Sequence, residues 1–333
     1  MRVLERAWYS GACWPRVLFP LEYLFVTLAK RQRAKKQADA WQAPVPVIVV
    51  GNISVGGTGK TPVVVALITM LRQAGYNPGV VSRGYGAKPP YVPYRVTADC
   101  TAQVGGDEPT MIVQRTDVPL IIDPDRPAAC RALLESAQCD VIISDDGLQH
   151  YALQRDIEIA VVDSQRGLGN QHCLPVGPLR EPAQRLTECD FIIINGQGAF
   201  NYPEAARMVL VASKLVPLQA ELFPVSVAEW AGKSVHGVAG IGNPERFFLA
   251  LEALGLKVIR HSFPDHHPYR DEDIAFNDGL PVIMTEKDAV KCRALKLPES
   301  TYYLPVDAQF DNGFEAHLLE RLTQKISERA NHG

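Results

Sequence analysis

The 333-residue sequence has no Cys-x-x-C pair, no low-complexity tract and no apolar run that would span a bilayer comfortably. Its seven cysteines are scattered, which argues against a zinc site or a disulfide framework and favours a reducing compartment. The apolar N-terminal stretch has no small-residue cleavage site, so the pattern does not indicate a signal peptide. Apolar residues make up 47% and charged residues 21%, values typical of a soluble globular chain whose length favours two domains.

Positive charge is concentrated at the N-terminus. Residues 1–36 contain eight basic and two acidic side chains, whereas the whole chain has a net charge of −3. Aromatic and leucine side chains lie between these charges, and the stretch ends in the basic run 30–36. This pattern suits a helix lying in the interface of an anionic leaflet, while packing of the helix on the protein's own core is the alternative, and both can hold. Because the remaining chain is acidic, we do not expect nucleic-acid binding.

A glycine-rich segment follows the apolar run 47–50. It consists of Ser54, Val55, Gly56, Gly57, Thr58, Gly59, Lys60 and Thr61. Small residues let backbone N–H groups converge on phosphate oxygens, and the N-terminus of a following helix adds a favourable dipole. In this interpretation Lys60 reaches the β- and γ-phosphates of a nucleoside triphosphate, and the Thr61 hydroxyl ligates Mg²⁺. Ser54 stands where the pattern usually opens with glycine, and a chance glycine-rich turn is the alternative.

Apolar strands alternate with helical segments up to about residue 215, where the pattern restarts. We expect strands at 47–50, 79–82, 118–122, 141–144, 157–162, 191–194 and 208–212, and helices at 62–74, about 105–115 and 126–136. Such alternation predicts an α/β fold, a doubly wound parallel sheet of the P-loop NTPase type. The expected organisation is a membrane-associating amphipathic helix (1–40), a P-loop NTPase-type domain (41–215) and a smaller α/β domain (216–333). Residues 87–104 read as irregular.

Two acidic side chains end the expected strand at 141–144. A carboxylate that leaves a sheet beside a phosphate loop can hold Mg²⁺ directly or through water, so Asp145 and Asp146 are candidate metal ligands. An Asp pair that caps a turn before Gly147 is the alternative. Arg83 follows another strand, and the carboxyl ends of parallel strands are where such sheets bind ligands.

Two further groups are ambiguous when taken alone. Asp107 and Glu108 stand at an expected helix start, where Asp107 could simply be an N-cap. His266 and His267 lie in a proline-containing loop, where a hydrogen-bonded surface pair is the alternative to a catalytic role.

The order of several short motifs resolves these ambiguities. Besides the phosphate loop, they are Ser-Arg-Gly-Tyr-Gly (82–86), Gly-Asp-Glu-Pro (106–109), Asp-Asp-Gly-Leu-Gln-His (145–150), Leu-Pro-Val-Gly-Pro-Leu-Arg-Glu-Pro (174–182), Phe-Pro-Asp-His-His (263–267) and Thr-Glu-Lys-Asp-Ala-Val-Lys (285–291). From about residue 10 to 310 the chain resembles the tetraacyldisaccharide 4′-kinase family, the lipid A 4′-kinases of Gram-negative bacteria. Several of these motifs are nearly private to that family.

The resemblance implies phosphorylation by ATP of the 4′-hydroxyl of a tetraacylated glucosamine disaccharide 1-phosphate, which gives lipid IVA. It implies Asp107 as the base on the sugar hydroxyl, tuned by His266, with Glu108 and the Asp145–Asp146 pair serving Mg²⁺. Arg180 and Glu181 match family positions that matter for activity, without a mechanistic role that the sequence supplies. The resemblance also implies peripheral attachment of the N-terminal helix to an anionic membrane surface, the cytoplasmic face of the inner membrane, and we expect a monomer.

Two other functions remain as alternatives. A membrane-cycling switch of the partitioning-ATPase type also combines an amphipathic segment with a phosphate loop, but its signature lysine is replaced here by Val55. A kinase of soluble small molecules would leave the N-terminus purely structural. A GTPase is not indicated, because residues 195–198 lack the Lys and Asp that read the guanine base.

Overall fold

A nine-stranded sheet forms the larger layer of the computed structural model, which describes residues 2–219 and 223–331. The strands lie in the order β15-β8-β7-β6-β1-β5-β2-β4-β3, with antiparallel edge strands β15 and β3 and parallel strands between them. Their bounds are β1 Val47–Gly51, β2 Pro78–Ser82, β3 Tyr94–Val96, β4 Leu120–Ile122, β5 Val141–Asp145, β6 Ile157–Asp163, β7 Phe191–Asn195, β8 Ala206–Val211 and β15 Asp307–Phe310. The predicted parallel α/β sheet is confirmed.

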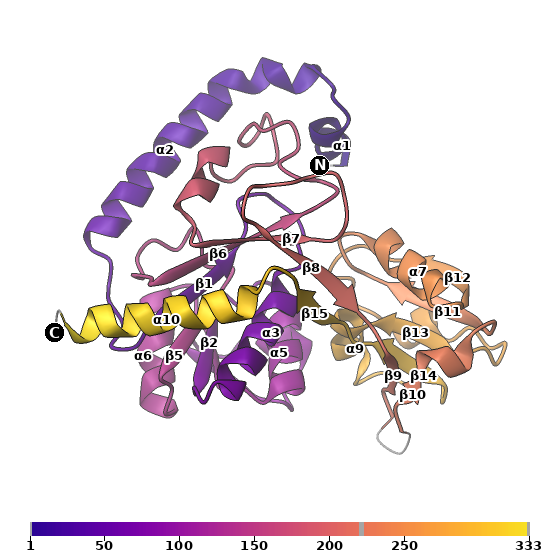
Figure 1. Cartoon of the computed structure of the whole chain (residues 1–333). Helices are drawn as coiled ribbons and strands as arrows, with labels where there is room; N and C mark the ends of the chain where they lie inside the picture. The colour runs from indigo at the N-terminus through magenta and orange to yellow at the C-terminus, as the bar shows by residue number, and fades with distance from the viewer. Residues whose placement is uncertain (1, 220–222, 332–333) are drawn as a thin grey trace.

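A second sheet of six strands lies beside the first (Figure 1). Its order is β10-β9-β14-β13-β11-β12, in which β12, β11, β13 and β14 are parallel. The strands are β9 Lys214–Pro217, β10 Val225–Ser226, β11 Ser234–Ala239, β12 Lys257–Ser262, β13 Val282–Thr285 and β14 Thr301–Leu304. This sheet is the smaller α/β unit that the restart of the pattern near residue 215 predicts.

Helices pack on both sheets, and further helices come before the first strand in the sequence. The α-helices are α1 Arg2–Tyr9, α2 Phe19–Ala38, α3 Lys60–Gln73, α4 Ala102–Gly105, α5 Asp107–Thr116, α6 Arg126–Ser136, α7 Pro244–Ala253, α8 Asp271–Ile274, α9 Glu286–Cys292 and α10 Phe314–Ala330. The short 3₁₀ helices are η1 Trp14–Leu18, η2 Ala183–Glu188 and η3 Val227–Trp230.

The central strand β1 shows how the large core divides between two faces. Ile48 and Val50 pack on one face with α3, α5 and α10, while Val47 and Val49 pack on the other with α6. The four side chains are at most 1% exposed. Because successive side chains of a strand point to opposite faces, a wholly apolar run such as β1 requires a layer on each side.

The C-terminal segment packs on the first sheet. The sequence instead predicts that all residues from 216 onward belong to the smaller domain. Strand β15 pairs with β8, and α10 lies along the first unit (Figure 1). Phe314, Leu318 and Leu322 of α10 enter the same core as β1. A terminal amphipathic helix packs on whichever apolar face lies open, and its sequence does not say which one. Residues 87–104 also differ from expectation, because they contain the edge strand β3 and helix α4.

Helix α2 runs along the outside of the first unit (Figure 1). Phe25 and Val26 pack toward the core, whereas Leu21, Leu24 and Leu28 belong to the exposed apolar side chains of the chain. Within residues 2–219 and 223–331, no helix is long and apolar enough to cross a membrane.

Candidate functional site

The phosphate loop connects β1 to α3 at the carboxyl end of the central strand. Gly59, the N-cap of α3, has φ +92°, and a Cβ there would lie 2.2 Å from Nδ2 of Asn195. That amide donates a hydrogen bond of 2.9 Å to the Thr58 carbonyl. Glycine adopts this positive φ without strain and has no Cβ to collide with Asn195. The loop therefore has the local geometry of a phosphate-binding loop.

A second segment braces the start of this loop. Ser54, which is 6% exposed, forms an isolated bridge with Leu179. The Val55 N–H donates to the Pro178 carbonyl at 2.8 Å, and the Arg180 N–H donates to the Ile53 carbonyl at 2.7 Å. The motif at 174–182 therefore lies along the loop, which brings Arg180 and Glu181 to it although they are far away in sequence.

Lys60, Asp146 and Arg180 form a charged cluster at the mouth of the loop. Lys60 Nζ lies 3.4 Å from Asp146 Oδ1, and Arg180 Nη1 lies 3.4 Å from Asp146 Oδ2. Burial alone would raise the pKa of Asp146, but Lys60 and Arg180 lower it below its ordinary value. Asp146 has φ +47°, so its backbone adopts the left-handed conformation that directs the carboxylate toward these two cations.

Asp145, the residue before Asp146, has the opposite environment. Its side chain is buried; Oδ2 accepts a hydrogen bond of 3.1 Å from Ser82 Oγ, and Oδ1 has no partner. Burial, with the nearby charges of Glu108 and Asp146, raises the pKa of Asp145 to about 7. Lys60 and Arg126 offset only part of this effect, so an orphaned carboxylate oxygen whose pKa stays raised is a place where a further cation would be favourable.

Asp107 and His266 meet across the two units. His266 Nδ1 lies 2.9 Å from Asp107 Oδ2, and the ring of Tyr85 lies 5.5 Å from that of His266. The N-cap of α5 is Gly106, so the interpretation of Asp107 as a simple N-cap is wrong. An ionised carboxylate can only accept, so the imidazole N–H donates in this pair.

A lysine joins the acidic side chains of both units. Lys287 Nζ lies 3.2 Å from Glu108 Oε1 and 3.5 Å from Asp265 Oδ1. Although burial would lower the pKa of Lys287, these carboxylates and Asp107 raise it above its ordinary value. A protonated lysine thus holds Glu108 beside the dyad and in electrostatic range of Asp145.

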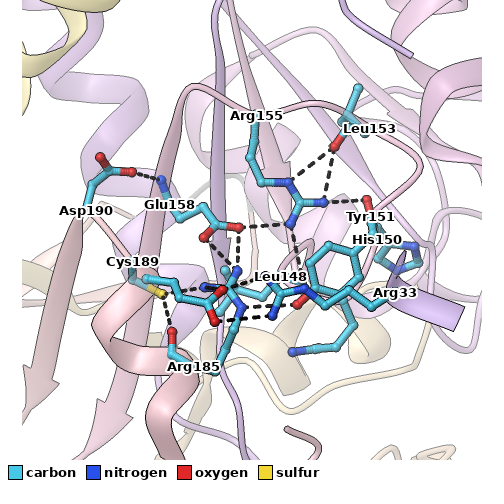
Figure 2. A network of polar contacts seen from close by, with 12 residues as sticks. Arg33, Leu148, His150, Tyr151, Leu153, Arg155, Glu158, Arg185, Cys189 and Asp190 are labelled. Atoms are coloured by element: carbon cyan, nitrogen blue, oxygen red, sulfur yellow. Dashed lines mark hydrogen bonds and ion pairs between the residues drawn. The ribbon is translucent and has the colours of Figure 1, made fainter. Parts of the chain in front are cut away.

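Glu181 reaches a buried polar network rather than the loop. Its Oε1 accepts a hydrogen bond of 2.8 Å from Gln149 Nε2, and its Oε2 accepts one from the hydroxyl of Tyr151. Figure 2 shows the surroundings of Tyr151, with Arg33, Arg155 and Arg185 close to its ring.

A cavity of about 620 Å³ opens between α2 and the site. Its walls combine apolar, charged and loop side chains, among them Phe25, Val26, Arg33, Val55, Arg180 and Glu181. The predicted site therefore has an entrance on the side of the N-terminal helix.

The predicted metal ligands do not by themselves form a complete coordination site. In the described ranges no group of three or more His, Cys, Asp or Glu side chains could hold a metal ion. Thr61 is the second residue of α3, and its role as a ligand stays a prediction. Mg²⁺ is commonly held by one or two carboxylates together with substrate phosphates, and the buried Asp145 beside the loop fits that mode.

Sequence reasoning missed the residues that support the site. Asn195 was noted only for lacking a guanine-reading motif, yet it braces Thr58 and accepts a hydrogen bond of 2.8 Å from Arg246 of α7. Tyr151 and Arg185 gave no signal, because buried polar contacts between distant segments have no periodic pattern.

The comparisons with known proteins agree on one family. The model of the tetraacyldisaccharide-1-P 4′-kinases matches residues 14–323. A tetraacyldisaccharide 4′-kinase of Azotobacter vinelandii is 52% identical over 96% of this chain and 98% of its own, and one of Pseudomonas fluorescens is 50% identical over 98% and 97%. The crystal structure of "apo" form LpxK from Aquifex aeolicus in complex with ATP is 26% identical, with a TM-score of 0.77 over 93% of this chain and 99% of that one.

Proposed function

The chain belongs to the tetraacyldisaccharide-1-P 4′-kinase family, and from that premise we propose how its residues carry out the reaction. It is a tetraacyldisaccharide 4′-kinase, which phosphorylates the 4′-hydroxyl of tetraacyldisaccharide 1-phosphate in lipid A biosynthesis. Membership rules out the partitioning-ATPase switch and the kinase of soluble small molecules.

The donor ATP binds at residues 54–61. The solved relative from Aquifex aeolicus is in complex with ATP, and the loop here has the glycine geometry that phosphate binding needs. Lys60 neutralises the β- and γ-phosphates, and Arg180 adds positive charge to the transferring group. Phosphoryl transfer depends on such positioning and charge neutralisation more than on covalent chemistry by the protein.

Asp145, Asp146, Glu108 and Thr61 are the candidate ligands for Mg²⁺. The unpartnered oxygen of Asp145 supports this assignment most directly. When bound, the ion neutralises developing charge on the phosphate oxygens. Asp146 then keeps Lys60 and Arg180 in place through its ion pairs.

Asp107 accepts the proton of the sugar 4′-hydroxyl, and His266 orients its carboxylate. The observation that carries this proposal is the 2.9 Å contact between Asp107 Oδ2 and His266 Nδ1. A sugar hydroxyl is a poor nucleophile, so a positioned carboxylate that takes its proton late in the transfer assists the reaction. Because the pair joins the two units, their relative position controls whether the base is in place.

The acceptor lipid arrives from an anionic membrane surface, to which α2 attaches peripherally. Exposed Leu21, Leu24 and Leu28 would enter the interface, and the basic run 30–36 would meet anionic headgroups. We assign this surface to the cytoplasmic face of the inner membrane and propose that a monomer is sufficient. The cavity between α2 and the loop is the proposed path of the disaccharide.

Label transfer tests the assignment of the base. With γ-labelled ATP and the disaccharide lipid, Asp107→Ala should transfer label at least about a hundredfold more slowly than the wild type. ATP binding should remain, because Asp107 does not contact the loop. Equal turnover by the two proteins would show that another group accepts the proton.

A further inference from the structure

Tyr151 lies at the centre of a partly buried, charge-balanced network between α2 and the first sheet. Its side chain comes directly after the Asp-Asp-Gly-Leu-Gln-His motif, is 5% exposed and lines the cavity beside α2. Around it stand as many cations as anions, namely Arg33, Arg155, Arg185, Glu158, Glu181 and Glu188. None of these residues except Glu181 has a part in the reaction described so far.

On the side of the first sheet, several hydrogen bonds hold the network together. Glu158 of β6 accepts a hydrogen bond of 2.9 Å from Arg155 and one of 2.6 Å from Arg185 (Figure 2). The side chain of Arg185 is 2% exposed, and its Nε donates to the Tyr151 hydroxyl oxygen at 3.1 Å. With its oxygen occupied by that donor, the hydroxyl directs its own proton to Glu181.

From Glu181, further hydrogen bonds orient the side chain of Gln149 and, through it, that of Arg180. Glu181 accepts one N–H of Gln149 at 2.8 Å, and the Asn52 carbonyl accepts from the same nitrogen at 3.1 Å. The amide of Gln149 is thereby fixed with its oxygen toward Arg180, whose Nη1 lies 3.5 Å away. Arg180 in turn lies against Asp146.

Arg33 of helix α2 contacts this series of residues. The Arg33 guanidinium lies 4.7 Å from the centre of the Tyr151 ring, donates to Glu188 and lies 3.9 Å from Glu181. Arg31, two residues earlier, is exposed and has no such contact. A continuous series of polar contacts therefore runs from α2 to Lys60.

We propose that Tyr151 and Arg33 are positioning residues, which act through Glu181 and Gln149 to hold Arg180 against Asp146. Through Arg33, the seating of α2 on Tyr151 then sets the turnover of the phosphate site, in addition to bringing the enzyme to its lipid. The inference rests on the proposed function, and it gives Glu181 a role that its position in the family motif leaves open.

Kinetics of Tyr151→Phe test the first part. The change keeps the ring and its cation contacts and removes only the hydroxyl. We expect kcat in mixed micelles to fall about tenfold, with the KM for ATP and for lipid within about twofold of the wild type. In a Glu181→Gln background, Tyr151→Phe should have little further effect, because both act on one series of contacts. Thermal unfolding midpoints close to the wild type would show that the loss is not one of folding.

Arg33→Met and its matched control Arg31→Met test the second part. Each removes one positive charge from α2, so a purely electrostatic role at the membrane predicts equal effects. Because both residues belong to the basic run 30–36, we expect the two variants to raise the lipid KM to a similar extent, and only Arg33→Met to lower kcat at saturating lipid as well. Combined with Tyr151→Phe, it should reduce kcat no further than the more impaired single variant.

Several outcomes would overturn the inference. Wild-type kcat for Tyr151→Phe, equal losses for the two arginine variants, or a rise in lipid KM alone for Arg33→Met would each do so. Asp107→Ala in the same assay separates this failure from failure of the proposed function. If Asp107→Ala is inactive while Tyr151→Phe is unimpaired, only the positioning role is lost.

Discussion

Two adjacent carboxylates at the end of β5 have opposite properties because they face different neighbours. Asp146 lies between Lys60 and Arg180, which lower its pKa. Asp145 is buried with one oxygen unpartnered, and its pKa is raised to about 7. The sequence offers both as metal ligands, whereas the structure distinguishes a carboxylate paired with two cations from a buried one with an unpartnered oxygen.

This difference predicts a pH-dependent stability. The pKa of Asp145 lies above its ordinary value of 3.8, so the folded state binds the proton more tightly than the unfolded state, and stability falls as pH rises from about 4 to about 7. Without nucleotide or metal, Asp145→Asn should therefore be more stable than the wild type at pH 8, by on the order of 2 kcal/mol. Denaturant unfolding at pH 8 and pH 5 measures the difference, which should narrow at the lower pH.

Asp146→Asn is the matched control. It removes a carboxylate that is already paired with Lys60 and Arg180, so it should bring no gain at pH 8. A less stable Asp145→Asn at pH 8 would contradict the assignment of Asp145 as the unneutralised acid.

At the scale of elements, α2 both belongs to the fold and exposes apolar surface. Phe25 and Val26 face the core, and Glu22 accepts a hydrogen bond of 2.5 Å from the Cys173 N–H. Leu21 and Leu24 are 53% exposed. Core packing and membrane contact, which the sequence left as alternatives, are thus compatible on different faces of one helix.

Removal of residues 1–36 should impair lipid use more than ATP binding. The deletion takes away the exposed leucines, the basic run and one wall of the cavity, but it leaves the phosphate loop. We expect a higher lipid KM, a lower kcat and weaker binding to anionic vesicles, with ATP affinity nearly unchanged. Vesicle sedimentation and micelle kinetics measure these effects, and unchanged partition together with unchanged activity would refute the role of α2.

Local elements were the most predictable part of the structure. Helix α6 spans the predicted residues 126–136, and α3 differs from the predicted 62–74 by one or two residues at its ends. Their apolar spacing and flanking glycines or prolines are local signals. The edge strands β3 and β15 are three and four residues long, too short for alternation to be recognised.

For the site, the sequence could indicate candidate residues only where they belong to a recognisable motif. The structure places Asp107 beside His266 and gives Gly59 the positive φ of a phosphate-binding loop, while the catalytic and binding roles of these residues stay predictions. Tyr151 and Asn195 could not be predicted, because their roles depend on contacts with segments far away in sequence.

At the scale of the whole molecule, the chain leaves the first sheet after β8, builds the second sheet and returns through β15 and α10 (Figure 1). The second unit is thus an insertion with two connections to the first. It contributes His266 and Lys287 to a site whose loop and acidic side chains come from the first unit. Two connections restrict how the units move, so the distance between Asp107 and His266 reports their relative position.

The most direct test of this account is the turnover of His266→Ala at saturating ATP and lipid. If the histidine holds the base in place, kcat should fall by at least about tenfold while ATP affinity stays near that of the wild type. His267→Ala is the matched control, since that side chain contacts Asp273 within its own unit. Wild-type turnover by His266→Ala would contradict the proposal that the second unit completes the catalytic dyad.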